Sequence, residues 1–196
     1  MAIDAKTVSQ LREMTGAGMM DAKRALEETN GNLEQAVETL RKKGLLKAAT
    51  KSDRVTKEGK VHAYIHSNGK VGAMVEVLCE TDFVARNEHF LALCNDLALH
   101  ICASDPLYVR RENVPPEVVE KAKAMYKEEV VASGKPEAVQ EKIIEGKMNK
   151  YFSECVLLEQ VFVKDDKKTV DEVVKEAITK IGENIQVGRM SRFIIG

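Results

Sequence analysis

The sequence predicts an α+β fold, in which a bundle of three short helices precedes a small antiparallel sheet covered by helices. Three observations predict it. Apolar residues recur at helical spacing up to about residue 43, and they alternate strictly from residue 61. The pair Asn68-Gly69, which favours a hairpin turn, then separates two alternating runs. Helical spacing returns after residue 88.

The amino-terminal part predicts three helices with two breaks between them. The first helix begins near Asp4 and ends at the loop 15–18, whose two glycines permit a sharp turn. The second helix covers about 19–29. Asn32 is expected to cap the third helix, which ends at Gly44 after a basic last turn. Three short helices of this kind make a compact module with a small core.

A change in composition divides the chain. We expect a helical bundle over 1–45, a basic linker over 46–59 and an α+β core over 60–196. Between residues 41 and 60 there are eight basic and two acidic residues, a local charge of +6. Such a run can contact RNA or an acidic protein face, or it can be a solvated connector.

The alternating runs predict a hairpin of strands 61–66 and 71–78. The first strand carries His62 and His66, a pair that would bind zinc if it lay on a helix. In a strand the two residues are about 13 Å apart at ~3.3 Å per residue, which is too far for one zinc ion. We therefore expect the histidines on a polar strand face.

The rest of the core predicts four helices and a final strand that joins the hairpin. Met125 is expected to point inward with its apolar neighbours, and a capping pattern begins at Thr169. The segment 162–167 is expected to be a connection and turn. The predicted elements cover, in order, 88–103, 116–133, 137–158, 170–181 and 185–195.

Composition excludes several classes of protein. The net charge is -1, aromatic residues make up 5% and tryptophan is absent, so neither a basic footprint nor a base-stacking platform is expected. No apolar run reaches the ~18 residues of a membrane span, and residues 1–10 lack the apolar region of a secretory signal. We expect a cytoplasmic protein that binds neither membrane nor nucleic acid directly.

The chemistry-bearing residues form no catalytic pattern. The four cysteines stand in apolar stretches at unrelated spacings, which predicts small buried side chains in a reducing cytosol, with intermolecular disulfides as the alternative. Phosphate-binding loops and nucleophile elbows are missing from the sequence. We therefore expect a binding protein with no catalytic residue, no metal and no cofactor.

Three segments together resemble one family, bacterial elongation factor Ts. Residues 11–23, LREMTGAGMMDAK, are similar to its amino-terminal signature, and residues 80–87, ETDFVARN, are similar to its central signature. Residues 157–166 with 180–184 are similar to its carboxy-terminal part. The segments occur in the family's order and together span essentially the whole chain.

This resemblance implies both a fold and an activity. The first module would be a ubiquitin-associated-like bundle, and the remainder would be the family's core domain. Members are guanine-nucleotide exchange factors and not enzymes. They bind elongation factor Tu in its GDP-bound and nucleotide-free forms. Long members carry the core twice, whereas this chain has one copy, which implies a homodimer formed through the core.

The resemblance also implies site residues. Asp82 and Phe83 would be inserted beside the Mg²⁺ site of elongation factor Tu and displace the ion, with Val84 and Ala85 completing the insertion. The implied partner-binding residues are Arg12, Met19, Met20, Lys23, Thr81, Arg86 and Asn87.

From the residues alone, other interpretations stay open. Phe83 stands seven positions before Phe90 and could be the first core residue of the helix that follows, while Asp82 could favour a helix N-terminus. Met19 and Met20 cannot both face inward, so at least one is expected on the surface. A ubiquitin-associated-type adaptor or nascent-chain-binding protein would explain the first module, and an RNA-binding protein would explain the basic run.

Overall fold

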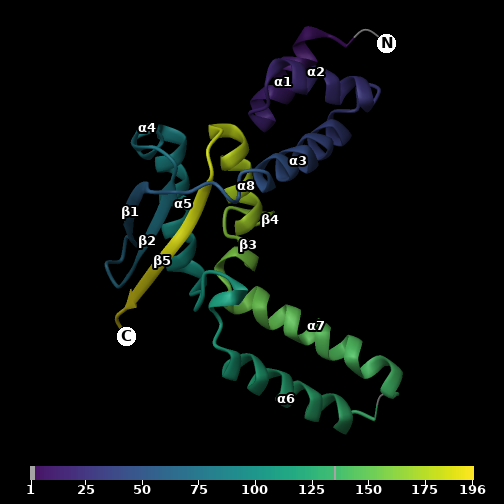
Figure 1. The fold of residues 1–196 in the computed structure, drawn as a ribbon, viewed down its shortest axis with the longest axis vertical. Coiled ribbons are helices and arrows are strands. Elements are labelled where there is room, and N and C mark those ends of the chain that lie inside the picture. Colours follow the sequence, from purple (N-terminus) through teal and green to yellow (C-terminus); the bar gives the residue numbers. More distant parts are fainter. Residues whose placement is uncertain (1–2, 135) are drawn as a thin grey trace. The chain divides into compact units, whose positions relative to one another are not determined.

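The computed structural model describes residues 3–134 and 136–196 and contains the helices and the small sheet that the sequence predicts (Figure 1). Contacts divide the chain into two compact units, and neither is continuous in sequence. Unit 1 comprises the chain up to Lys60 together with residues 78–93 and 172–186, and unit 2 comprises residues 61–77, 94–171 and 187–196.

Unit 1 begins with the predicted helical bundle. Its helices are α1 (Ala5–Thr15), α2 (Met19–Glu28) and α3 (Leu33–Ala49). Small and medium apolar side chains form the core, and alanines make up half of it, so the three helices approach one another closely. This core consists of Val8, Leu11, Ala22, Ala25, Leu26 and Ala36.

The helix ends follow the predicted local rules. Gly16 adopts a φ of 66°, and its N–H donates to the Arg12 carbonyl at 2.8 Å, which closes the end of α1. Asn32 Oδ1 accepts a hydrogen bond from the Gln35 N–H at 3.0 Å. The prediction that Asn32 caps the third helix is therefore confirmed.

The predicted end of the third helix at Gly44 is wrong, because α3 continues to Ala49. Gly44 costs a helix interior about 1 kcal/mol relative to alanine, which burial beyond it can offset. Ala48 is buried, and Thr179 Oγ1 donates to the Gly44 carbonyl at 2.8 Å. A Cβ at position 44 would make only ordinary van der Waals contact with Thr179, so the structure leaves room for a small side chain there.

Much of the basic charge between residues 41 and 60 is paired within the chain. Five of the eight basic residues form ion pairs with carboxylates, and those partners come from several elements of unit 1. The pairs are Arg41–Glu172, Lys42–Glu38, Lys43–Glu28, Lys47–Asp21 and Arg54–Glu80. The positive run therefore belongs largely to the surface network of unit 1.

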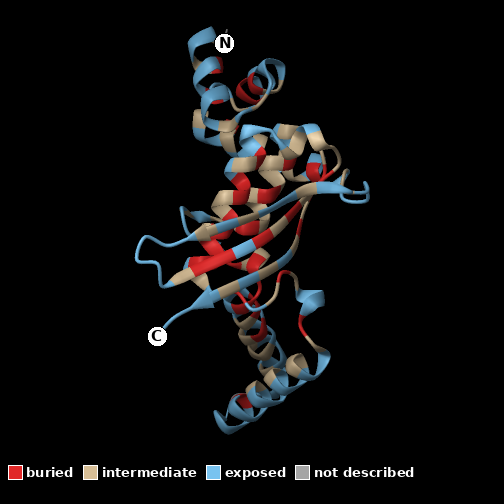
Figure 2. Ribbon diagram, turned by 90° about the vertical axis from the view of Figure 1, so that its left-hand side faces the viewer, coloured by how far each residue is buried: buried red, intermediate tan, exposed pale blue. Residues whose placement is uncertain are grey.

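A three-stranded sheet contains β1 (Glu58–Ile65), β2 (Val71–Cys79) and β5 (Ile185–Ile194) in the order β1-β2-β5. The His66 N–H donates to the Val71 carbonyl at 2.9 Å and closes the predicted hairpin. The last strand joins β2, as the sequence predicts. Buried residues alternate along β2, so one face of the sheet is covered (Figure 2).

The exposed face of β1 is the one that carries its apolar residues. Val61 and Ile65 are each 65% exposed, whereas His62 is half-buried. His62 shares a strand face with Tyr64, as the alternation predicts, but this polar face of β1 is the more covered of the two. Alternation defines the two faces of a strand, but it does not specify which face other elements cover.

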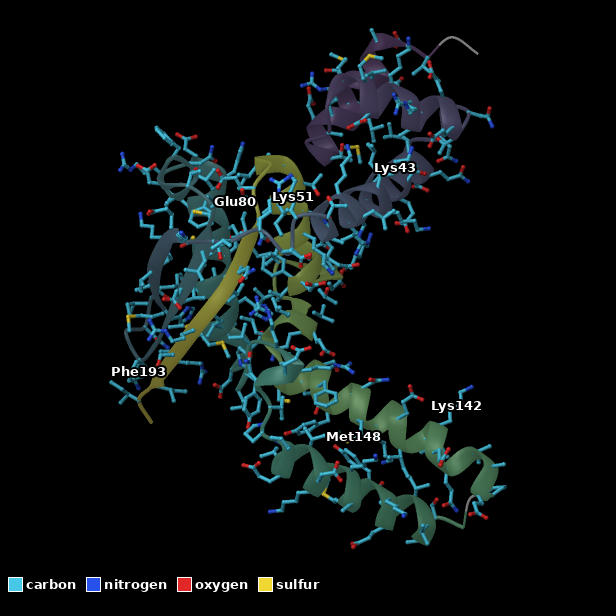
Figure 3. All side chains as sticks on the ribbon, viewed as in Figure 1. Lys43, Lys51, Glu80, Lys142, Met148 and Phe193 are labelled. Atoms are coloured by element: carbon cyan, nitrogen blue, oxygen red, sulfur yellow. The ribbon has the colours of Figure 1, made fainter. Side chains whose placement is uncertain are left out.

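The helix α5 (Glu88–Ser104) follows the sheet hairpin, and its predicted apolar face is buried. In unit 2, α6 (Pro116–Ala132) and α7 (Glu137–Cys155) form a helical hairpin around Met148 and Phe152 (Figure 3). Met125 is 55% exposed, so its predicted inward orientation is wrong. The contacts with α7 are made by other residues of α6, among them Ala122 and Tyr126.

The segment predicted as a turn contains a second small sheet. Strands β3 (Val161–Phe162) and β4 (Asp165–Thr169) pair antiparallel, and α8 (Val170–Ile181) follows them. Short 3-10 turns, η1 (Arg111–Asn113) and η2 (Leu157–Glu159), lie in the preceding connections. Within the described residues, none of the helices has the length and apolar character needed to cross a membrane.

A buried histidine holds this second sheet against α5. His100 Nδ1 accepts the Val163 N–H at 3.2 Å, and its Nε2 lies 2.9 Å from Gln160 Oε1. The ring stacks on Phe162. Because Nδ1 accepts a backbone donor, the neutral ring carries its proton on Nε2 and donates it to Gln160. Burial lowers the pKa of His100 below 6.5, while the Gln160 contact opposes that shift.

We predict that His100 makes the stability of the protein fall as the pH drops below about 6.5. The pKa of His100 is lower in the native state than in the unfolded chain. Below about pH 6.5 the unfolded chain therefore binds more protons than the native state, and protonation favours unfolding. The urea midpoint should therefore decrease between pH 7 and pH 5.5, and less steeply in His100→Gln. The exposed His66→Gln serves as the control and should keep the wild-type slope. A wild-type slope in His100→Gln would contradict the assignment.

Candidate functional site

The candidate residues fall into two groups, one on the amino-terminal helices and one on or beside α4 (Asp82–Ala85). A helix of four residues is not stable by itself, because the conformational entropy lost in nucleating it exceeds the stabilisation from so few hydrogen bonds. The turn is held by its ends. Thr81 is the N-cap, and its Oγ1 accepts the Val84 N–H at 3.4 Å. The Asn87 N–H donates to the Val84 carbonyl at 2.9 Å.

Phe83 is the most exposed large side chain of this turn, with 80% of its surface accessible. The interpretation of Phe83 as a core residue is therefore wrong. Phe90, which is fully buried, is the first aromatic core residue of α5. Val84 and Ala85 are half-buried, so they form the base from which the Phe83 ring projects.

Charged and polar candidates surround Phe83. Asp82 Oδ2 accepts a hydrogen bond from Arg86 Nη2 at 3.0 Å, and both side chains are largely exposed. Asn87 Oδ1 accepts the His89 N–H at 2.8 Å at the start of α5. Thr81, and not Asp82, is the N-cap of α4, but Asp82 lies in the first turn, where a negative charge favours the helix N-terminus.

The amino-terminal candidates lie around the Gly16 turn. Met19 and Met20 are 53% and 66% exposed, so the expectation that at least one is on the surface is confirmed for both. Arg12 Nε donates to the Ala17 carbonyl at 3.3 Å and braces the loop between α1 and α2. Lys23 pairs with Glu27 at 3.8 Å on the exposed face of α2.

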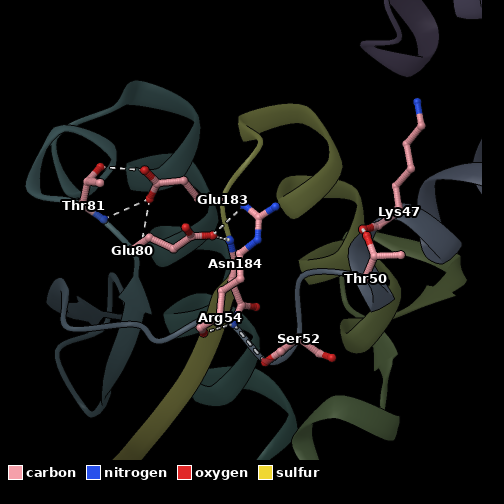
Figure 4. A network of polar contacts seen from close by, with 8 residues as sticks. All are labelled: Lys47, Thr50, Ser52, Arg54, Glu80, Thr81, Glu183 and Asn184. Carbon is pink, nitrogen blue, oxygen red and sulfur yellow. Dashed lines mark hydrogen bonds and ion pairs between the residues drawn. The ribbon is translucent and has the colours of Figure 1, made fainter.

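Behind α4 lies a polar network that the sequence patterns do not indicate (Figure 4). Glu183 Oε2 accepts the N–H groups of Glu80 and Thr81, each at 3.1 Å. Glu183 Oε1 accepts the Thr81 hydroxyl at 2.7 Å. The Thr81 side chain is therefore engaged inside the chain. The only sequence signal for Glu183 is its place in the segment 180–184 that resembles elongation factor Ts.

The second carboxylate of the network, that of Glu80, accepts a hydrogen bond from the segment that carries Glu183. Glu80 Oε1 accepts the Asn184 N–H at 2.6 Å and lies 3.4 Å from Arg54 Nη1. Asn184 is buried, and its Nδ2 donates to the carbonyls of Ser52 and Arg54 at 3.2 and 2.8 Å. Three segments of unit 1 that are distant in sequence thus meet directly behind the Phe83 turn.

Cys79, next to the network, is buried, and burial together with the Glu183 charge raises the pKa of its thiol to about 11. It therefore stays protonated at neutral pH. The predicted burial of the four cysteines is confirmed, and none of them forms a disulfide within the described residues. Across residues 3–134 and 136–196, no group of three or more His, Cys, Asp and Glu side chains could hold a metal ion.

Comparison with known proteins gives a consistent result. The sequence model of the family "Elongation factor TS" matches residues 3–178. The chain is 55% identical to elongation factor Ts of Thermosipho melanesiensis over 194 residues, which is 99% of each chain. The chain belongs to the elongation factor Ts family.

Other members of the elongation factor Ts family agree over the full length. Elongation factor Ts of Geobacter sulfurreducens is 55% identical over 196 residues, which cover all of this chain and 91% of the relative. That of Fervidobacterium nodosum is 54% identical over 196 residues, the whole of both chains. The match extends far beyond the helical bundle. A ubiquitin-associated-type adaptor would account for that bundle alone. Membership therefore makes the chain a translation elongation factor.

We predict that Phe83→Ala changes the free energy of unfolding by less than about 1 kcal/mol, because the ring is mostly in solvent. Phe90→Ala is the matched control, since that ring is fully buried and its removal should cost ~3–5 kcal/mol. Urea unfolding of both variants measures the difference. Comparable losses in the two variants would show that Phe83 supports the fold.

Proposed function

We propose that this chain is a guanine-nucleotide exchange factor that binds elongation factor Tu with GDP bound, displaces Mg²⁺ and promotes GDP release so that GTP can bind. It acts by binding alone, so no bond of the nucleotide is broken and the chain is not an enzyme. Its partner is the GDP-bound and then the nucleotide-free form of elongation factor Tu, and its place of action is the cytoplasm. Membership in the elongation factor Ts family supports this proposal.

The observation that carries the proposal is the exposed ring of Phe83 on a fixed turn. Exposed aromatic side chains bury a large area when they enter a partner's pocket, and a prior backbone constraint lowers the entropy lost on binding. The ring is 80% exposed, while the backbone beneath it is capped at Thr81 and held by Glu183. Such a side chain is suited to insertion.

The mechanism follows from competition for one region of the partner. GDP on a GTPase is held through its phosphates and an associated Mg²⁺ ion, which neutralises part of their charge. The Phe83 ring enters between the elements that orient this ion, with Val84 and Ala85 filling the space beneath it and Asp82 meeting the partner's donors. Loss of Mg²⁺ lowers the affinity of the partner for GDP. The coupling is reciprocal, so nucleotide binding in turn lowers the affinity of the partner for the exchange factor.

The two groups of candidate residues have different tasks in this proposal. The bundle of residues 1–45 docks on the nucleotide-binding domain of elongation factor Tu through Arg12, Met19, Met20 and Lys23. The linker 46–59, whose first residues complete α3, connects it to the core 60–196, which carries the Phe83 turn flanked by Arg86 and Asn87. Exposed methionines support docking, because their flexible side chains adapt to a protein surface.

Release of labelled GDP from elongation factor Tu, with and without this chain, tests the proposal. The wild-type chain should accelerate release. At saturating concentration, Phe83→Ala should lower the rate at least several-fold, and Asp82→Ala should lower it as well, with smaller effects on binding. Met125→Ala, an exposed apolar residue on α6, is the control and should behave as wild type. Wild-type rates with Phe83→Ala would exclude the wedge role.

We further propose that two copies of this chain pair through the exposed face of the three-stranded sheet in unit 2. The chain has one core where long family members have two. Val61 and Ile65 on β1 project from this face, and Ile65 Cδ1 lies over Gly72 of β2. Phe193 is 67% exposed near the end of β5. Its neighbour Arg192 donates to the Cys102 carbonyl of α5, so Phe193 points to the opposite, uncovered face.

Sedimentation tests the pairing. We expect a dimer at about ten micromolar, a concentration above typical dimer dissociation constants. Ile65→Asp and Phe193→Asp should each shift the protein to the monomer, because they place charge inside an apolar contact. Leu107→Asp is the matched control, since Leu107 is also 65% exposed but lies outside the sheet. A monomeric wild-type chain with full exchange activity would contradict the proposal.

A further inference from the structure

Behind α4, each of two chain segments contributes a carboxylate that accepts hydrogen bonds from the backbone of the other segment. Glu183 accepts hydrogen bonds from the backbone of Glu80 and Thr81, and Glu80 accepts one from the backbone of Asn184. Each segment thus provides the acceptor for the other segment's free N–H groups. Reciprocal bonds of this kind fix relative position more tightly than a single ion pair, because no one contact can break without leaving another group unsatisfied (Figure 4).

Glu183 determines which way the Thr81 hydroxyl points. A hydroxyl has a single proton, and Glu183 Oε1 receives it at 2.7 Å. The lone pairs of Thr81 Oγ1 are therefore free to accept the Val84 N–H at 3.4 Å and cap the helix. Without the carboxylate the hydroxyl can rotate, and the four-residue helix loses the fixed start on which it depends.

Phe83 is two residues from Thr81 and has no comparable anchor of its own. Its side chain is 80% exposed, so its direction is set by the backbone of α4. That backbone is in turn set by the N-cap and by the N–H groups of Glu80 and Thr81. Glu183 therefore connects the folded body of unit 1 to the orientation of the ring, alongside the buried Cys79 thiol, which donates to the Thr81 carbonyl at 3.2 Å.

We propose that Glu183 is a positioning residue for nucleotide exchange, which holds the Phe83 turn in the orientation that enters elongation factor Tu. This inference rests on the proposed function. Glu183 acts through Thr81 and does not itself meet the partner. Its removal lowers the rate of GDP release at saturation and affects docking little, because the docking surface of α1 and α2 is untouched.

A merely structural role predicts a different pattern. If Glu183 only stabilised unit 1, its replacement would lower the folded fraction and reduce exchange equally with or without the Phe83 ring. If it positions the ring, its replacement has no further effect once the ring is gone. The double-mutant cycle between Glu183 and Phe83 separates the two roles.

The test combines hydrogen exchange with GDP release, using the full chain. In Glu183→Gln the amides of Glu80, Thr81 and Val84 should exchange at least tenfold faster, while those of buried Val75 and Leu97 keep their protection. GDP release at saturating Glu183→Gln should fall at least fivefold, with a less than twofold change in the half-saturating concentration. In the Phe83→Ala background the same replacement should change release less than twofold. Glu129→Gln, an exposed carboxylate paired with Lys147, is the control and should match wild type.

Equal fold-losses in both backgrounds, or unchanged release in Glu183→Gln, would overturn the positioning role. If Glu183→Gln does not fold, Thr81→Val is run through the same cycle, because it removes the hydroxyl that Glu183 orients. A wild-type chain that fails to accelerate GDP release overturns the proposed function and this inference with it. Accelerated release with additive losses overturns the inference alone.

Discussion

The Glu183 carboxylate, which accepts three hydrogen bonds from Glu80 and Thr81, is the interaction on which the candidate site depends. Hydrogen bonds to an ionised acceptor are among the stronger ones in proteins, and removal of one partner leaves the others unsatisfied. Here the consequence is local. The bonds end at the cap of α4, so they act on a turn that has almost no stability of its own.

This arrangement resolves a conflict between exposure and order. A phenylalanine in solvent contributes nothing to folding, and a side chain on a loose loop loses entropy when a partner fixes it. In this chain the ring of Phe83 is exposed while the peptide groups beneath it are bonded to Glu183. The cost of ordering the turn is met during folding, so the ring is ready for a partner before contact.

Much of the fold follows from short-range patterns. The Asn68-Gly69 hairpin, the capped third helix and the buried face of α5 could be predicted because each depends on residues close in sequence. The β3–β4 pair could not, since its segment is rich in charge and its support comes from His100, about sixty positions earlier. Likewise Gly44 is a helix end by local rules, and only Thr179 and buried Ala48 explain why α3 continues.

The candidate site divides in the same way. The pattern of residues 80–87 identified the turn by its resemblance to a family, but helical spacing alone favoured Phe83 as a core residue. Its exposure results from a cap that a residue about one hundred positions away completes, and no local pattern contains that information. The same holds for Val61 and Ile65, whose face of β1 is left uncovered by the arrangement of unit 2.

The most direct measurement of the central claim is photo-crosslinking from position 83. Phe83 is replaced by benzoylphenylalanine, and the chain is irradiated with elongation factor Tu in its GDP-bound form. The account predicts a crosslink to the partner's residues that surround its Mg²⁺ site, with a yield that falls when Glu183→Gln is added and when excess nucleotide and Mg²⁺ are present. Crosslinks confined to surfaces remote from that site, or none beyond the level seen from exposed Met125, would contradict it.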